Sequence, residues 1–449
     1  MWRVCRERII VIQVALDPLG PSALGAVPLS AFPTPQPHLP FGTLGAEIAI
    51  GATFLIHVTV VGFILGSAGI TPFMELVGRR RGGDEHYLRY ARNLSRAILY
   101  LYSFGATWAV FAVVLLTGLY GRLIGTLLNL LLLPLTIAFA SFFVGIPLML
   151  LYVYGWDRLN PKLHLAVGFA FAAMQFVFLF MIVQLDSYIL TPGTAVSSAH
   201  AMFSPSYPWL LLHYVGATIS WTALFLAAVA VWRGRRATSE GEIVFQRWAA
   251  RINFAIGSIF LLAQPITGFL LADTIKSAAL PTFDNLFVLG SGSLFIGQVG
   301  LLAIVVVGAN LVFWRHNLDA SESGPGGALT VIALLGMGGT ALPASVIPQQ
   351  LVWLRYVALL IAFVATTANL VIYVRSLRQS RGSVGINPVV GRLIGVVGVA
   401  ALVLSIYMGV LKENSKSPCG IDPTTGQSTC LLTLHQSTQD FNAPPGILP

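Results

Sequence analysis

Long apolar stretches alternate with short polar ones along most of the 449-residue chain. Ten of them are long enough to cross about 30 Å of hydrocarbon as helices rising ~1.5 Å per residue. Backbone groups in lipid must be hydrogen-bonded within their own segment, so each stretch is predicted to be a transmembrane α-helix. The predicted spans are Ala46–Phe73, Ile98–Leu119, Leu128–Tyr154, Leu163–Ile189, Trp209–Trp232, Ile252–Leu271, Leu289–Trp314, Ala328–Ile347, Leu351–Val374 and Val389–Leu411. Three glycines between 336 and 339, together with Pro343, make the eighth span the weakest helix former.

The composition fits a lipid environment. Hydrophobic residues make up 56% of the chain and charged residues only 10%, against about 25% charged residues in soluble proteins. We therefore expect an all-α integral membrane protein with an N-terminal extension (1–45), a transmembrane helical domain (46–411) and a C-terminal tail (412–449). The first residues, "MWRVCRERIIVIQVAL", open like a signal peptide, but Gln13 interrupts a short apolar run, and a misplaced start site explains them equally well.

The basic residues predict an orientation. Every second loop is rich in them, as in "VGRRRGGDEHYLRYARNLSR" and "WRGRRATSEGEIVFQRWAAR", whereas the loop "LTPGTAVSSAHAMFSPSYP" has none. Short loops rich in Lys and Arg stay in the cytoplasm, so both termini are predicted to lie outside it. This placement explains the net charge of +9 without a nucleic-acid partner.

The tail holds two of the three cysteines. Cys419 and Cys430 are predicted to form a disulfide if this side of the membrane is oxidising, with two free thiols as the alternative. The chain has no CxxCH sequence, so covalent c-type haem attachment is not expected.

Two of the eight histidines, His57 and His213, are taken to lie within the spans, about 15 Å and about 6 Å deep respectively. An ionisable side chain inside a membrane is by default a functional candidate because its burial is costly. Neutral imidazole is a common ligand of haem iron, and the alternative is a histidine bonded to a neighbouring helix carbonyl. Two such residues favour metal centres, and their unequal depths favour two centres over one bis-histidine haem.

Several motifs stand in the order found in one known family. His57 is followed by "MELV" and a basic loop, and "YGWDRLNPKLHL" ends the third span and places His164 at the start of the next. "DSYILTP" and a proline-containing loop then lead to "LLLHYVGATISW" with His213. Over about Gly45 to Leu271 the chain resembles the large subunit (subunit I) of cytochrome bd quinol oxidase. The Gly-Trp-Asp-Arg-Leu block is the most specific of these motifs.

The resemblance implies cofactors. His57 would ligate a high-spin haem near an oxygen-reducing centre, and His213 would be one axial ligand of a low-spin haem b that accepts electrons from quinol. The family's second ligand to that haem is a methionine, and the matching position in "IGQVGLL" is Gln298, which either contacts the haem or bonds neighbouring helices. Arg355 either pairs with a haem propionate or extends to the membrane surface.

The sequence also departs from the family. The third span, Leu130–Tyr154, contains no acid where the family has two glutamates, and Thr340 in "GTALPASV" replaces a haem-ligating glutamate. The family's long quinol-binding loop is reduced to "ADTIKSAALPTFDN". Asp186 is the remaining deep acid, and a structural bond to a neighbouring helix explains it better than proton transfer. Because buried carboxylates usually relay protons in membranes, the scaffold is predicted to be kept and most of the oxygen chemistry lost.

The leading hypothesis is a divergent homologue of cytochrome bd subunit I. It would be a multi-pass protein of a bacterial cytoplasmic (inner) membrane that binds one or two haems b and transfers electrons in a respiratory complex. Expected partners are a second membrane subunit, quinone or quinol, a periplasmic electron-donor protein and lipid. The alternatives are a cofactor-free membrane anchor and a transporter-like subunit whose histidines line a path.

Overall fold

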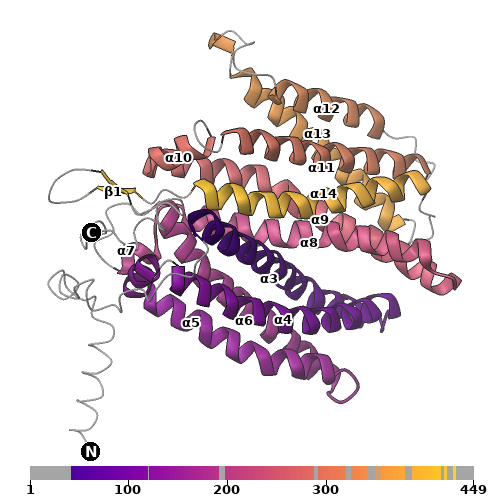
Figure 1. Ribbon diagram of the computed structural model, residues 1–449. Helices are drawn as coiled ribbons and strands as arrows, with labels where there is room; N and C mark the ends of the chain where they lie inside the picture. Colours follow the sequence, from indigo (N-terminus) through magenta and orange to yellow (C-terminus); the bar gives the residue numbers. More distant parts are fainter. Residues whose placement is uncertain are drawn as a thin grey trace, which may run out of the picture.

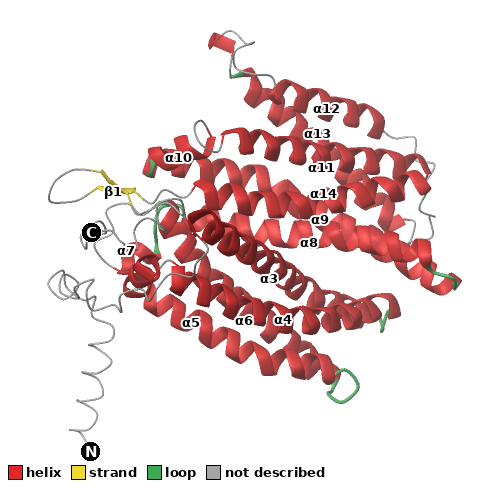
Figure 2. Cartoon of the chain, in the orientation of Figure 1, coloured by secondary structure: helices red, strands yellow, loops and turns green. Residues whose placement is uncertain are grey.

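Almost every described part of the chain is helical (Figure 2). The structure is a computed structural model and describes residues 42–119, 121–191, 198–287, 292–319, 325–341, 349–351, 353–379, 387–415, 419–421 and 428–430. The predicted signal-like segment and most of the predicted C-terminal tail lie outside these residues.

The elements follow one another as helices, with one short strand pair after the last helix. They are α3 (Gly42–Arg80), α4 (Glu85–Leu119), α5 (Gly121–Tyr154), α6 (Pro161–Leu190), α7 (Ser198–Met202), α8 (Tyr207–Arg236), α9 (Glu240–Ala278), α10 (Leu280–Phe287), α11 (Gly292–Asp319), α12 (Gly326–Ala341), the 3₁₀ turn η2 (Gln349–Leu351), α13 (Leu354–Gln379), α14 (Pro388–Ser415), β1 (Cys419–Ile421) and β2 (Ser428–Cys430).

Nine helices among the described residues are long and apolar enough to cross a membrane, and they coincide with nine of the ten predicted spans. The chain is therefore a multi-pass membrane protein. The eighth predicted span, Ala328–Ile347, differs: its described part is the 16-residue helix α12, which is only ~24 Å long at ~1.5 Å per residue. The glycines at its end weaken the helix, as the sequence indicated, and residues 342–348 lie outside the described part.

Helix α8 is the centre of the bundle. It packs against α9, α14 and α3, and it is the most deeply buried of the nine spans. Helices α3 to α6 lie on one side of it, α11 to α13 lie on the other, and α14 packs against both α8 and α11 (Figure 1). The last helix therefore joins the two halves of the chain.

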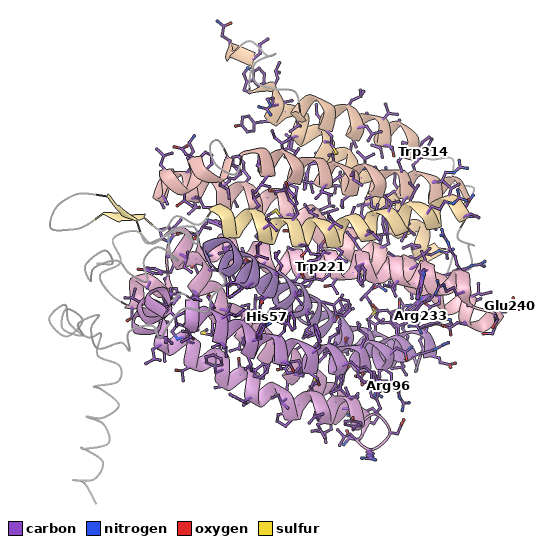
Figure 3. The ribbon with its side chains drawn as sticks, in the orientation of Figure 1. His57, Arg96, Trp221, Arg233, Glu240 and Trp314 are labelled. Carbon is purple, nitrogen blue, oxygen red and sulfur yellow. The ribbon has the colours of Figure 1, made fainter. Side chains whose placement is uncertain are left out.

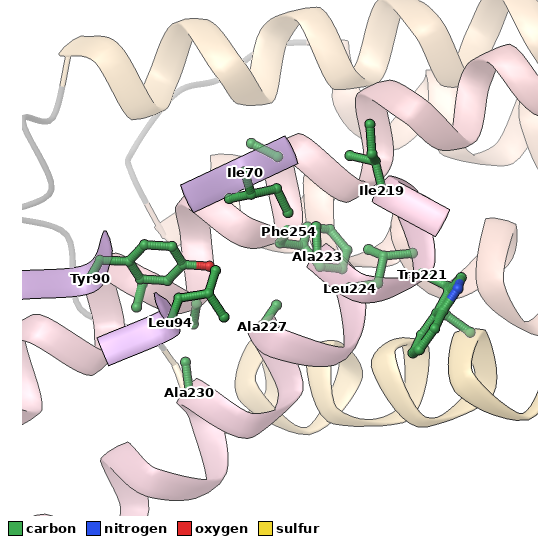
Figure 4. Packing of buried hydrophobic residues seen from close by; sticks show 14 of the residues in the cluster. Ile70, Tyr90, Leu94, Ile219, Trp221, Ala223, Leu224, Ala227, Ala230 and Phe254 are labelled. Carbon is green, nitrogen blue, oxygen red and sulfur yellow. The ribbon is translucent and has the colours of Figure 1, made fainter. Parts of the chain in front are cut away.

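The core around α8 consists of small and aromatic residues. Ala223, Ala227 and Leu224 are at most 1% exposed and face Phe254 of α9 (Figure 4). Small side chains let helix backbones approach closely in membranes, where packing and not the hydrophobic effect holds helices together. Helices α3 and α14 approach the backbone of α8 closely at Gly66 and Gly398, where an added Cβ would overlap a carbonyl oxygen of α8.

The basic loops gather at one end of the bundle. The turns between α3 and α4, α5 and α6, and α8 and α9 lie together there, far from β1 (Figure 1). Arg96 and Arg233 mark this end, and His57 lies nearer the opposite one (Figure 3). This arrangement is the one expected of loops on a single side of a membrane. That this side is the cytoplasm, and that both termini lie outside, stay predictions.

At the opposite end, strands β1 and β2 pair antiparallel. Cys419 is the direct partner of Cys430 in this register, which is the pairing that the predicted disulfide requires. The disulfide itself stays a prediction.

Candidate functional site

His213 is held in place by helix α9. It lies on α8, and its Nδ1 is 3.1 Å from Oγ1 of Thr267. That hydroxyl also donates to the carbonyl of Ala263 at 3.1 Å. In the orientation that satisfies its other contacts, the side-chain amide of Gln264 donates to the same nitrogen at 3.2 Å. Helix α9 therefore engages Nδ1 through two side chains, whereas Nε2 has no hydrogen-bond partner among the residues that the structure describes.

Gly268 of α9 leaves room for the imidazole of His213. A Cβ at Gly268 would lie 3.4 Å from Cε1 of His213, so the imidazole packs directly on the backbone of α9. A histidine that ligates a metal usually bonds its other ring nitrogen to a protein acceptor, which fixes the tautomer and the ring orientation. In His213 the contacts of Nδ1 with Thr267 and Gln264 hold the ring orientation and leave Nε2 as the nitrogen that a metal could reach.

His57 lies on α3 beside the backbone of Gly105 on α4. Its Nδ1 is buried and has no hydrogen-bond partner among the residues that the structure describes. A buried polar atom without a partner costs about 1–3 kcal/mol, and native structures seldom tolerate it without a reason. An axial bond to a haem iron would supply a partner. The hydrogen bond of the ring to the backbone of Gly105 is the alternative that the sequence left open, so the haem contact of His57 stays a prediction.

The packing of α3 against α8 shows that His57 and His213 lie at more similar heights than the sequence predicted. A Cβ at Gly66 of α3 would lie 2.5 Å from both the carbonyl of Thr218 and Oγ1 of Thr222 on α8, so Gly66 lies level with the turn 218–222. Counting back at ~1.5 Å per residue, His57 and His213 differ in height by only about 3 Å. The sequence overestimated the difference because its depths were counted from the first apolar residue of each span.

The two imidazoles nevertheless have different surroundings. His57 lies against α4, whereas His213 lies against α9. Unequal depth therefore no longer supports two separate centres, and whether the two imidazoles belong to one centre or to two stays a prediction.

Gln298 and Arg355, the other two candidate haem contacts, lie on α11 and α13 and have different neighbours. Gln298 is half-buried on α11, and the adjacent Gly297 packs against the hydroxyl of Tyr407 on α14. Two axial ligands of one haem lie on opposite faces of the macrocycle and do not bond to each other, so these contacts do not test the predicted haem contact of Gln298, which stays a prediction.

Arg355 lies closer to the His213 site. The ring of its neighbour Tyr356 on α13 contacts Phe269 of α9, with centroids 6.5 Å apart, and Phe269 follows the glycine that His213 packs on. The Nε of Arg355 donates to the carbonyl of Thr340 at 3.1 Å. The structure thus pairs Arg355 with the residue that replaces the family's glutamate, and it leaves the predicted propionate contact untested.

Sequence reasoning missed a buried polar cluster that joins α3, α5 and α6. Oε1 of Glu75 accepts from Nε of Arg79 and contacts Nδ1 of His164, both at 2.7 Å. Its Oε2 accepts from the hydroxyl of Tyr152 at 2.8 Å. Nε2 of His164 lies 2.8 Å from the carbonyl of Tyr152. Both ring nitrogens of His164 therefore have an oxygen partner within the cluster.

The prediction that only His57 and His213 lie within the spans is wrong, because His164 and His316 also lie within them. His164 and Glu75 are both 0% exposed, and His316 is 3% exposed near the end of α11. His164 also stacks between the rings of Tyr152 and Trp156, with centroids 4.7 and 4.5 Å away. The signal available in the sequence was Glu75 itself, an acid inside a long apolar helix with Arg79 one turn later.

Asp186 has the structural role that the sequence favoured. Its Oδ2 accepts from the hydroxyl of Tyr214 at 3.2 Å, which ties α6 to α8. Tyr214 directly follows His213, so this bond helps to fix the helix that presents the imidazole.

Comparisons with known proteins agree with this architecture. Residues 46–279 match the family described as cytochrome bd terminal oxidase subunit I. The chain is 26% identical over 237 residues to the putative cytochrome bd menaquinol oxidase subunit I of Bacillus subtilis (strain 168), a match that covers 50% of this chain and 52% of the relative. The match thus spans about half the length of that curated relative.

A solved structure extends the similarity to most of the fold. The bd oxidase from Geobacillus thermodenitrificans superposes with a TM-score of 0.51 at 16% identity, covering 82% of this chain and 97% of the solved chain. At this identity the superposition shows a shared fold. The family match covers more than half of the chain and includes both spans that carry His57 and His213. The chain therefore belongs to the cytochrome bd terminal oxidase subunit I family.

Proposed function

We propose that this chain is the haem-bearing electron-transfer subunit of a bd-like respiratory complex. The observation that carries the proposal is His213, whose Nδ1 is engaged by Thr267 and Gln264 of α9 while Nε2 has no hydrogen-bond partner within the described residues. His57, with a buried and unpartnered Nδ1, is the proposed ligand of a second haem. A bound haem b supplies reversible one-electron chemistry.

The residues of the chain have distinct tasks in this proposal. Thr267 orients the imidazole of His213, and Asp186 holds the following Tyr214. Arg355, which lies next to the aromatic contact between α13 and α9, is the proposed partner of a haem propionate and would exchange its bond to the Thr340 carbonyl for that contact. Quinol or a periplasmic electron-donor protein is the proposed donor, and a second membrane subunit is the proposed partner.

The proposed activity is electron transfer and does not include dioxygen reduction. Glu75 is the fully buried carboxylate of the described spans, and it is already engaged by Arg79, His164 and Tyr152. A carboxylate fixed by this many donors is poorly suited to carry protons to a distant centre. Dioxygen reduction at a rate typical of bd oxidases would contradict this part of the proposal and is measured as oxygen uptake with reduced quinol.

The test is a reduced-minus-oxidised visible spectrum of the purified protein. The unchanged protein is expected to show the bands of haem b. His213→Ala is expected to abolish the low-spin bands because Ala has no ligand atom. Thr267→Val keeps the ligand but loses its orienting bond, and it is expected to weaken haem binding by about 10- to 100-fold.

His86→Ala is the matched control. His86 lies at the start of α4 at the basic end of the bundle and stacks on Phe245, so its loss is expected to leave the spectrum unchanged. A colourless purified protein would overturn the proposal and favour a cofactor-free anchor or a transporter-like subunit. A spectrum insensitive to His213→Ala would remove His213 as a ligand.

A further inference from the structure

A cavity opens at the basic end of the bundle, between α4 and the turn that joins α5 to α6. Its volume is about 260 Å³, below the roughly 300–1,000 Å³ of pockets for drug-sized ligands. A group the size of a lipid headgroup suits it, and a haem does not. Its lining residues include Arg92, Arg96, Tyr100, Tyr154, Trp156, Asp157 and Arg158.

The charge of this cavity is positive. Arg92 forms an ion pair with Asp157, which neutralises one arginine. Arg96 and Arg158 are exposed, and neither has a carboxylate partner within the described part of the chain. Arginine binds phosphate through a planar fork of N–H donors, often in two parallel hydrogen bonds. The cavity therefore has the chemistry of a phosphate site.

The position of the cavity is the membrane–water interface. On α4 the apolar run begins directly after Arg96, and on α5 it ends at Tyr154. Tyr100 and Tyr154 are 75% and 62% exposed, as is typical of the aromatic residues that lie at headgroup level in membranes.

An apolar surface continues from the cavity into the membrane. Tyr100, Phe104, Trp108 and Phe111 follow one another on one face of α4. The rings of Phe104 and Trp108 are 5.7 Å apart, and those of Trp108 and Phe111 are 5.8 Å apart. Tyr100, Phe104 and Phe111 are each at least 47% exposed. This strip provides an acyl chain with a path that a free phosphate ion would not use.

We propose that this cavity binds the phosphate headgroup of an anionic phospholipid, with Arg96 and Arg158 as the phosphate ligands and the aromatic strip of α4 as the acyl-chain contact. Basic pockets between membrane helices bind acidic headgroups in this way on the cytoplasmic side. Trp156 forms one wall of the cavity and also donates to Ser95 and packs on His164. A bound lipid therefore braces the junction of α4, α5 and α6.

The experiment uses the full-length protein in a neutral detergent. Native mass spectrometry measures binding of phosphatidylglycerol, of phosphatidylcholine with the same acyl chains, and of inorganic phosphate. Phosphatidylglycerol is expected to bind at one site, more tightly than either of the other two probes. At about 1 kcal/mol for each basic side chain near the headgroups, the double variant R96Q/R158Q is expected to weaken this binding on the order of 30-fold.

Two further variants are controls, one for the charge of the two arginines and one for their position. R96K/R158K keeps both charges and is expected to retain most of the binding. R235Q/R378Q removes two exposed arginines from the same end of the bundle and is expected to leave the tight site unchanged. Equal affinity for the two lipids, or undiminished binding by R96Q/R158Q, would overturn the proposal. Displacement of phosphatidylglycerol by an equal concentration of inorganic phosphate would show a free-anion site instead of a lipid site.

Discussion

Replacing Glu75 with alanine is expected to lower the free energy of unfolding by about 3–5 kcal/mol, the usual cost of removing one partner from a buried charge pair. Glu75 is 0% exposed. Its two oxygens receive bonds from three helices: Arg79 on α3 itself, Tyr152 on α5 and His164 on α6. The alanine variant leaves the partly exposed guanidinium of Arg79 and the buried imidazole of His164 without their shared carboxylate partner. The measurement is the unfolding midpoint of the purified protein in detergent.

Two further variants are controls: one removes the charge of Glu75 but keeps its size, and the other removes an acid at the surface. Glu75→Gln keeps the volume and the acceptor for Tyr152 but removes the negative charge, so it is expected to lose most of the same stability. Glu242→Ala removes an acid that pairs with Arg89 at the surface, and exposed pairs contribute only about 0.2–1 kcal/mol. Equal losses from Glu75→Ala and Glu242→Ala would show that the buried cluster does not hold α3, α5 and α6 together.

The membrane helices could be predicted from the sequence because hydropathy alone decides them. A span of apolar residues must be helical in lipid whatever surrounds it, so neighbouring helices are not needed for the prediction. The one difference, α12, occurs where the local signal was weakest: its described part, Gly326–Ala341, contains the three glycines before Thr340 and is shorter than the other spans. The polar ends of helices were also missed, since α9 begins at Glu240 with a cap from Ser239, well before its apolar run.

Side-chain partners could not be predicted, because they depend on contacts between distant parts of the chain. His213 was identified as a candidate from its position in an apolar span, but Thr267 is 54 residues away in sequence. Glu75 and His164 are 89 residues apart, and only the packing of α3 against α6 brings them together. Gln298 was selected by local sequence similarity, and helix packing places it on α11 with α14 beside it. A local pattern therefore identified the histidines correctly as intramembrane residues, whereas their chemical surroundings required the fold.

Gly398→Ala is expected to destabilise the protein by about 1–3 kcal/mol, the usual cost of overpacking a core, and Gly398→Leu by more. Gly398 lies on α14 where that helix crosses α8. A Cβ there would overlap the carbonyl oxygen of Leu224 and lie 2.6 Å from Cβ of Ala228. Neither atom is the end of a flexible side chain, so the two helices themselves would have to separate. Because α14 joins α8 to α11, this separation would loosen the contact between the two halves of the bundle.

Gly395→Ala is the matched control on the same helix. It lies three residues before Gly398, and a Cβ at this position meets nothing within 4 Å. Alanine is favoured over glycine by about 1 kcal/mol inside a helix, so this variant is expected to be as stable as the unchanged protein or more stable. The unfolding midpoints of the two variants, measured in the same detergent, should move in opposite directions. If Gly398→Ala raises the midpoint as Gly395→Ala does, then the close approach of α14 and α8 does not limit the stability of the bundle, and the small residues around α8 would need another explanation.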